Sequence, residues 1–166
     1  MTASSPDDEV DLLIDAWSRR LPDVDFGPLD VMSRLRRVAI RLRALRAEAF
    51  RSAGLESWEF DVLAALRRAD PPHQLSPTEL VDRTMIGSAA MTNRLVRLSD
   101  RGLIERHPNT RDRRGVIVGL TAEGGNRVDA AMRELVRREA AELEGLSGED
   151  LAHLERVLRK LLGAAN

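Results

Sequence analysis

The chain has 166 residues, of which 43% are hydrophobic and 32% charged, and its formal net charge is −1. This composition is typical of a soluble globular protein, the length suits one domain or one domain plus a helical arm, and no apolar run is long enough to cross a bilayer. The absence of cysteine excludes disulfides, thiolate metal sites and thiol redox sensing, and the three histidines lack the spacing of a metal site. Since the acidic, polar start is unlike a secretory signal, we expect a cytoplasmic protein without cofactor, metal or membrane partner.

The charge is strongly segregated along the chain. Residues 1–30 carry eight acids against two arginines, whereas the stretch from Arg94 to Arg114 carries seven arginines against three acids. Local charge, rather than the total, decides whether a surface attracts phosphate. The arginine-rich stretch is therefore a candidate nucleic-acid contact.

Hydrophobic periodicity predicts three helices in the N-terminal part of the chain. Pro22 ends the first helix, whose apolar face consists of Val10, Leu13, Ile14, Trp17 and Leu21. A turn-rich stretch over 22–30 leads into a long helix over about 31–50, whose predicted inner face is Val31, Leu35, Val38, Leu42, Leu45 and Ala49. The third helix covers 57–69 and faces inward with Phe60, Leu63 and Leu66, and a proline-marked loop, ADPPHQ, follows it.

The segment LSPTEL marks the start of a helix. Ser76 is the N-cap, Pro77 takes the first helical position and Glu79 completes a capping box. This helix runs to about Thr84, and after the turn in MIGSAA a second helix covers 88–101, with Ala90, Leu95 and Leu98 on its periodic positions and Gly102 after its end. Two short helices joined by a tight turn indicate a helix-turn-helix, whose second helix can enter a DNA major groove.

A β-hairpin follows this motif. Leu103 and Ile104 begin one strand, residues 115–120 form the other, and the basic loop PNTRDRR joins them, so that the whole unit reads as a winged helix. Helices over about 122–143 and 148–162 complete a mainly α fold with one small hairpin, the last helix capped by Ser147 and striped with Leu151, Leu154, Leu158 and Leu161. The helices outside the winged helix have more apolar face than a monomer of this size can cover, which predicts a homodimer.

The predicted recognition helix and wing supply the groups that DNA recognition needs. Short polar side chains at the start of the helix allow it to sit deep in the major groove, and arginine binds guanine edges or phosphate. The wing arginines can enter the adjacent minor groove, where narrow A·T stretches attract positive charge. The candidate DNA-binding residues are Ser88, Thr92, Asn93, Arg97, Arg111, Asp112, Arg113 and Arg114.

The run GLIERHPNTRDRRGVIVGLT, together with LSPTEL and MTNRLVRL, resembles the MarR family of bacterial transcriptional regulators. Asp112 and Arg114 match the Asp-x-Arg wing motif of that family, and the resemblance covers about 29–162. It implies a homodimeric winged helix-turn-helix repressor that binds pseudo-palindromic operator DNA. The implied division is an acidic arm with an extra helix over 1–28, a dimerisation helix over 29–54, the DNA-binding domain over 55–121 and C-terminal dimerisation helices over 122–166.

The extra N-terminal helix resembles the urate-responsive branch of the family. The resemblance assigns ligand binding to Trp17, Asp61, Arg68, Arg94 and Arg106, with urate or xanthine as the effector. An indole wall and a bidentate arginine clamp would suit such a planar anion, while Asp61 would hold an arginine by a salt bridge. Trp17 has a second interpretation, in which it only packs the arm. A related group of regulators answers to citrate and aconitate, and those tricarboxylates remain an alternative effector.

Two other classes of function are open to test. An enzyme would need a nucleophile with a base, a carboxylate pair or a phosphate loop, and the sequence shows no such arrangement, so we predict no catalytic residues. A winged helix that binds only proteins would also fit the fold, but it leaves the arginine-rich wing unexplained. Salt-dependent DNA affinity separates that alternative from a DNA-binding regulator, because phosphate contacts release counterions.

Overall fold

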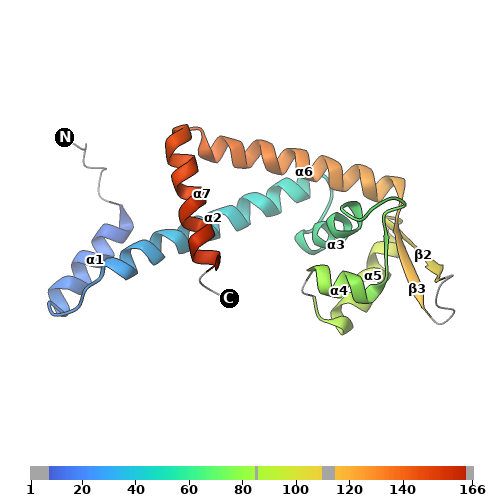
Figure 1. The fold of residues 1–166 in the computed structure, drawn as a ribbon, viewed down its shortest axis with the longest axis horizontal. Helices are drawn as coiled ribbons and strands as arrows, with labels where there is room; N and C mark the ends of the chain where they lie inside the picture. Colours follow the sequence, from blue (N-terminus) through green and yellow to red (C-terminus); the bar gives the residue numbers. More distant parts are fainter. Residues whose placement is uncertain (1–7, 85, 110–114, 164–166) are drawn as a thin grey trace. The chain divides into compact units, whose positions relative to one another are not determined.

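The computed structural model describes residues 8–84, 86–109 and 115–163, and within them the fold is mainly helical with one small antiparallel sheet (Figure 1). The chain divides into two compact units, 1–44 and 45–166, and the boundary falls inside the second helix. The elements in chain order are α1 (Glu9–Arg20), α2 (Gly27–Ser52), α3 (Ser57–Arg67), β1 (Gln74–Leu75), α4 (Pro77–Thr84), α5 (Ser88–Asp100), β2 (Ile104–Pro108), β3 (Val116–Leu120), α6 (Ala122–Leu143) and α7 (Gly148–Gly163).

The first unit contains α1 and the first part of α2. Asp8 caps α1 because its side chain accepts the backbone N–H groups of Val10 and Asp11. The helix α2 begins at Gly27, four residues before its predicted start near 31, so the second part of the stretch expected to be rich in turns is helical. The Asp25 side chain accepts the N–H of Gly27 at 2.9 Å, and Pro28 suits a first helical turn, where a missing N–H is harmless.

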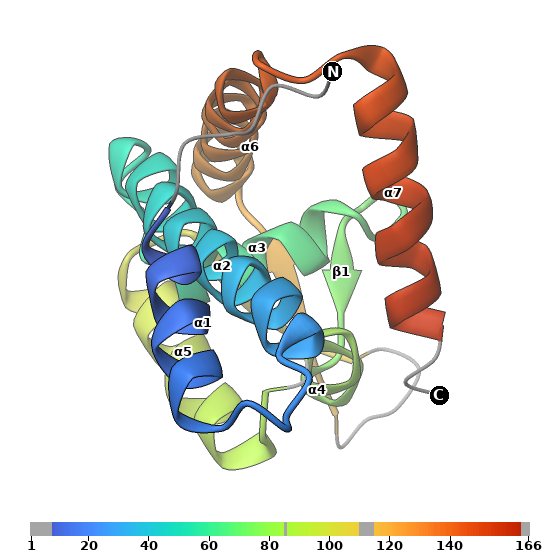
Figure 2. The ribbon, with the colours of Figure 1, turned by 90° about the vertical axis from the view of Figure 1, so that its left-hand side faces the viewer.

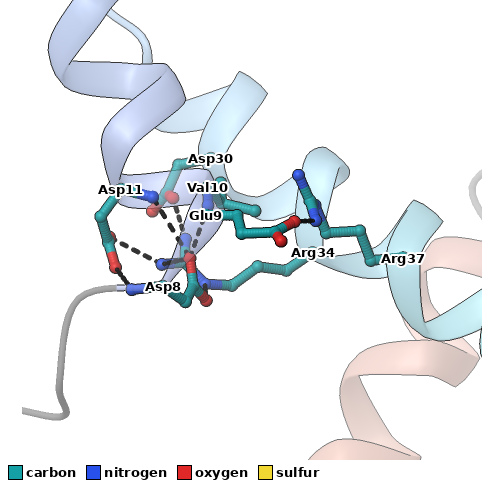
Figure 3. A network of polar contacts seen from close by, with 7 residues as sticks. All are labelled: Asp8, Glu9, Val10, Asp11, Asp30, Arg34 and Arg37. Carbon is teal, nitrogen blue, oxygen red and sulfur yellow. Dashed lines mark hydrogen bonds and ion pairs between the residues drawn. The ribbon is translucent and has the colours of Figure 1, made fainter.

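Arg34 on α2 gathers three carboxylates around its guanidinium group (Figure 3). Its Nη2 donates to Asp11 at 2.7 Å and its Nε to Asp8 at 3.1 Å, while its Nη1 binds Asp30 one turn earlier on the same helix. Arg37 binds Glu9 beside this group. The acidic start of α1 is thus held to α2 by ion pairs, with Val10 buried behind them.

The predicted inner face of α2 is only partly correct. Leu45 packs against the buried core and Ala49 is part of it, as expected. Val31 and Val38, however, are 61% and 53% exposed, so the first half of the stripe faces solvent in the single chain. An apolar stripe that the chain does not cover itself is the pattern expected of a helix that packs against another subunit.

The second unit is built around α3. Phe60, Leu63 and Leu66 are buried there, as the sequence predicts, and Phe50 of α2 stacks on Phe60 with ring centroids 3.9 Å apart. Residues of α4, α5, α6 and the sheet complete one contiguous cluster that includes Leu80, Leu95, Leu98, Val118 and Val128. This cluster fixes the helix-turn-helix against the rest of the unit.

The sheet has three strands in the order β1-β3-β2, and both pairings are antiparallel. In the hairpin, Arg106 lies opposite Val118 and Glu105 opposite Gly119. The short strand β1 pairs Gln74 with Gly119 and Leu75 with Val118, so the prediction of a plain loop through Gln74 was wrong. Two residues are too few to produce a periodic pattern, and tertiary pairing alone makes β1 a strand. Figure 2 shows β1 behind α3 and α4.

The helix-turn-helix follows the predicted boundaries closely. Ser76 and Glu79 exchange the reciprocal capping hydrogen bonds, with Ser76 N–H donating to Glu79 Oε2 at 2.8 Å. Gly102 ends α5 with a φ of 67°, a conformation that favours glycine. Ala90, which the periodicity placed on the inner face of α5, is exposed. Met91 is buried in its place.

The last two helices differ in how they pack. A Cβ on Gly124, near the start of α6, would lie 2.1 Å from the carbonyl oxygen of Leu103, so this close approach requires glycine. The helix α7 begins at the predicted Ser147 cap and buries none of its residues; its stripe is exposed at Leu154, Leu158 and Leu161. Among the described helices, none is long and apolar enough to span a membrane.

Candidate nucleic-acid interface and anion site

The N-terminal part of α5 presents short polar side chains to solvent. Ser88, Thr92 and Asn93 are all exposed. Thr92 donates its hydroxyl to the carbonyl oxygen of Ser88 at 3.2 Å, which leaves the oxygen lone pairs of its side chain available as acceptors. The arrangement offers donors and acceptors on one end of an exposed helix, as major-groove recognition requires.

Two arginines of α5 lie over one tryptophan of α3. The guanidinium carbons of Arg97 and Arg94 are 4.8 and 5.5 Å from the centroid of the Trp58 ring, within the range of cation–π attraction. Trp58 Nε1 donates to Glu56 Oε2 at 2.6 Å, and the other oxygen of Glu56 lies 3.9 Å from Arg97 Nη2. Trp58 and Glu56 were not singled out from the sequence.

The far end of α5 is tied to α3 by a buried acid. Arg101 Nη1 donates to both carboxylate oxygens of Glu59, and its Nη2 donates to the carbonyl oxygen of Gly54 at 2.8 Å. Glu59 is only 1% exposed and also accepts the N–H of Glu56 at 2.9 Å. Contacts in the middle and at the C-terminal end of the recognition helix therefore fix its position on α3.

The predicted wing contacts Arg111, Asp112, Arg113 and Arg114 follow β2 and precede β3 in sequence, and they lie outside the described residues. The described strands are joined beside this segment, where Asn109 N–H donates to the carbonyl oxygen of Gly115 at 2.9 Å. Arg106 is exposed on β2, and His107 beside it lies 3.1 Å from Glu105.

Asp61 on α3 lies within electrostatic range of arginines from α2, from α5 and from the end of α3. Its side chain is exposed, and among the described residues it forms no ion pair with these arginines, so the salt bridge expected of Asp61 is not observed. Burial raises the pKa of the Asp61 carboxyl, while the charges of Arg46, Arg94 and Arg68 act in the opposite direction and lower it. The structure thus brings together three of the predicted ligand residues, Asp61, Arg68 and Arg94. Arg46 of α2 also acts on Asp61. The sequence did not predict this, because α2 is rich in arginine and periodicity alone does not indicate which of its arginines comes near another element.

Trp17 belongs to the other unit. It lies on α1 and is 46% exposed, on the same helix as the exposed Leu12 and Leu13. Its ligand role and its alternative role in packing the arm both stay predictions.

A shallow hollow at the β3–α6 junction offers a second concave surface. Its lining includes Arg67, His73, Asp129 and Asn126. Arg67 donates two hydrogen bonds of 2.9 Å to Asp129, and its Nη1 lies 3.0 Å from His73 Nε2. Arg67, the one arginine among the described residues that line the hollow, is therefore paired with Asp129, which makes this surface a poorer anion site than the region of Arg46, Arg68 and Arg94. Within the described part of the chain, no cluster of histidines and acids has the arrangement of a metal site.

Comparison with known proteins agrees with this geometry. A family model described as MarR family matches residues 53–115. The transcriptional regulator PecS of Dickeya dadantii is 34% identical over 153 residues, which is 92% of each chain. A cysteine-to-serine mutant of MarR from Escherichia coli, solved in complex with operator DNA, superimposes with a TM-score of 0.68 at 28% identity over 84% of this chain and 99% of the other. A structure of BpsR from Bordetella bronchiseptica, from a study of its regulation by 6-hydroxynicotinic acid, gives a TM-score of 0.64 at 27% identity over 79% and 91% of the two chains.

Proposed function

Since the chain belongs to the MarR family of DNA-binding transcriptional regulators, we propose that it is a homodimeric repressor that binds a pseudo-palindromic operator and is released by a small organic anion. In this proposal the major groove of the operator is contacted by Ser88, Thr92, Asn93 and Arg97. The wing residues Arg111, Asp112, Arg113 and Arg114 hold the adjacent minor groove.

The exposed polar start of α5 is the observation that carries the DNA part of the proposal. It lies inside the segment that the family model matches, and a relative with the same fold has been solved with operator DNA bound. A protein-interaction module would not need this set of donors beside arginines. Dimerisation is supported by the uncovered apolar residues of α2 and α7, which a second subunit would bury. A dimer would also place its two recognition helices in successive grooves of one operator.

The arginines around Asp61 carry the ligand part. Arg46, Arg68 and Arg94 all act electrostatically on the single carboxylate of Asp61, so an incoming anion would meet three positive charges and one acid in this region. Arg94 also belongs to the recognition helix. An anion that draws Arg94 toward α3 would shift that helix, and DNA and anion would then weaken each other's binding by the same factor.

Urate or xanthine is the proposed effector, and citrate or aconitate is the second candidate. A planar purine anion would use the indole of Trp17 as well as the arginines, whereas a tricarboxylate would depend on charge alone. The cluster of arginines supports an anion of either kind, and Trp17 is the residue that separates them. Arg106, on β2, is the remaining proposed ligand residue.

The test is operator binding by the purified protein at fixed salt, titrated separately with urate, xanthine, citrate and aconitate. Release by urate or xanthine that is blunted by both Arg68→Ala and Trp17→Phe would support the purine site. Release by the tricarboxylates that needs Arg68 but not Trp17 would support the alternative. DNA binding that none of these anions changes would refute the ligand assignment while leaving the DNA-binding function in place.

A further inference from the structure

Trp58 is a fixed platform on α3. One part of the side chain packs against the buried core, and the indole Nε1 donates to Glu56 Oε2 at 2.6 Å. A ring held at its edge by a hydrogen bond and on its body by the core has little freedom to rotate. It can therefore define the position of whatever stacks on it.

What stacks on Trp58 is the pair of arginines from the recognition helix. Arg97 lies 4.8 Å and Arg94 5.5 Å from the ring centroid, and Glu56 adds a carboxylate oxygen 3.9 Å from Arg97. A free arginine side chain on a helix surface has many rotamers, and ordering it on DNA lowers affinity through lost side-chain entropy. An arginine that is already held loses less.

We propose that Trp58 is a positioning residue for operator binding, which holds the Arg97 guanidinium group in place on the recognition helix before DNA arrives. Glu56 fixes the orientation of the Trp58 ring through its hydrogen bond, and Arg94 is a second cation that stacks on the same ring. This inference rests on the proposed contact between Arg97 and DNA. It extends that proposal by assigning a DNA-binding role to a residue of α3 that need not touch DNA.

The first test compares operator affinity and its salt dependence among Trp58→Phe, Trp58→Leu, Arg97→Ala and the Trp58→Leu/Arg97→Ala double variant. Phenylalanine keeps a π face, so Trp58→Phe should bind operator nearly as the parent does. Leucine keeps apolar volume without a π face. Because both protomers of the dimer carry the substitution, Trp58→Leu should bind operator about five- to thirtyfold more weakly than the parent. Because the role acts through Arg97, the double variant should bind no more weakly than Arg97→Ala alone.

Each outcome of this cycle is decisive. Independent, additive losses in the double variant, or an undiminished affinity in Trp58→Leu when Arg97→Ala is weakened, would overturn the positioning role while leaving the DNA contact of Arg97 intact. Full affinity in Arg97→Ala would instead refute the proposed DNA contact itself, and the inference with it. An equal loss in Trp58→Phe and Trp58→Leu would indicate a merely structural tryptophan.

A second measurement does not depend on DNA or on how well Trp58→Leu folds. The chain has two tryptophans, so in a Trp17→Phe background the fluorescence reports Trp58 alone. Arg97→Met should change that emission, because the cation over the ring is removed, whereas Arg137→Met on the distant α6 face should not. Identical spectra for Arg97→Met and the Trp17→Phe parent would show that the stack is absent in solution and would overturn the proposal.

Discussion

Arg101 binds both carboxylate oxygens of Glu59, the one buried charged residue among those that the structure describes. The contact joins the end of the recognition helix to the start of α3. Substituting Arg101 by methionine keeps much of the aliphatic stem but leaves a buried carboxylate without its cation. We expect Arg101→Met to lower the free energy of unfolding by about 3 kcal/mol, which chemical denaturation would measure.

The matched control for this prediction is Arg137→Met. Arg137 binds Glu134 in an exposed pair on α6, with Nη2 to Oε1 at 2.7 Å, and Glu134 keeps Arg138 as a second partner. Exposed pairs contribute little to stability, so the denaturation midpoint should stay close to that of the parent. Equal midpoints for both variants would mean that Glu59 finds another way to satisfy its charge.

Gly124 and Gly125 provide a second matched pair, at the junction of the wing and α6. A Cβ on Gly124 would meet the Leu103 carbonyl oxygen at 2.1 Å, whereas a Cβ on Gly125 would be 3.8 Å from Leu120 Cδ2, an ordinary contact. Gly124→Ala should therefore destabilise the fold by about 1–3 kcal/mol, because backbone must move. Gly125→Ala should be neutral or stabilising by up to about 1 kcal/mol, since alanine is the better helix former. Thermal unfolding of both variants tests the ranking, and a reversed order would contradict the tight approach of α6 to the hairpin.

The parts of the fold that depend on local sequence were predictable. The Ser76–Glu79 capping box and the glycine after α5 lie within a few residues of the backbone groups that they satisfy, so their patterns predicted the observed helix ends. The strand β1 depends instead on pairing with β3, some forty residues away in sequence, and no local pattern encodes it. The start of α2 was missed because Asp25 and Pro28 can mark either a turn or a helix N-terminus.

The candidate site was predictable only where a resemblance supplied it. Asp61, Arg68 and Arg94 come from separate turns and helices, and the structure gathers them together with Arg46. Trp58 carries no signal of its own, because a tryptophan two residues before Phe60 on a helix with a buried face is typical of an ordinary core residue. Its stacking on Arg94 and Arg97 is visible only once α3 and α5 are packed.

The acidic arm should detach when Arg34 is removed. Arg34 binds Asp8, Asp11 and Asp30, so Arg34→Met should expose the start of α1 and increase amide hydrogen exchange at Val10 and its neighbours (Figure 3). Arg36→Met, an exposed arginine on the same helix, is the control and should leave exchange unchanged. Exchange at α1 that is the same in all three proteins would show that Arg34 does not hold the arm.

The same arm should loosen in acid. The backbone N–H of Asp8, followed by Arg34, holds the pKa of Asp11 below its usual value of 3.8. A carboxyl with a lowered pKa contributes stability above its unfolded value, and that contribution is lost as the pH falls through the folded value. The protection of α1 amides from hydrogen exchange, corrected for the intrinsic rate at each pH, should therefore fall below about pH 4 in the parent, and Arg34→Met should show a smaller change because part of the stabilisation is already gone.

The wing prediction concerns affinity for DNA rather than stability. If Arg114 enters the minor groove, Arg114→Ala should weaken operator binding by about 1–3 kcal/mol and should lower the slope of log affinity against log salt. Fluorescence anisotropy with an operator duplex over a salt series measures both quantities. Arg133→Ala, on α6, serves as the control for loss of a positive charge outside the proposed interface. Unchanged binding and slope in Arg114→Ala would remove this arginine from the interface.

Asp61 in its ionised form should lower the stability of the fold, even though three arginines act on it electrostatically. Burial raises the pKa of its carboxyl above 3.8, and this effect exceeds the opposing effects of Arg46, Arg94 and Arg68. A raised carboxyl pKa means that the folded state binds more protons than the unfolded state above pH 3.8, so stability falls as the pH rises through the folded value. Asp61→Asn should accordingly be at least as stable as the parent at neutral pH, and its advantage should disappear below about pH 4, where both side chains are uncharged. Denaturation of the two proteins over that pH range provides the measurement. A variant less stable than the parent at neutral pH would show instead that the arginines depend on the charge of Asp61 for their positions, as the salt-bridge interpretation of this residue requires.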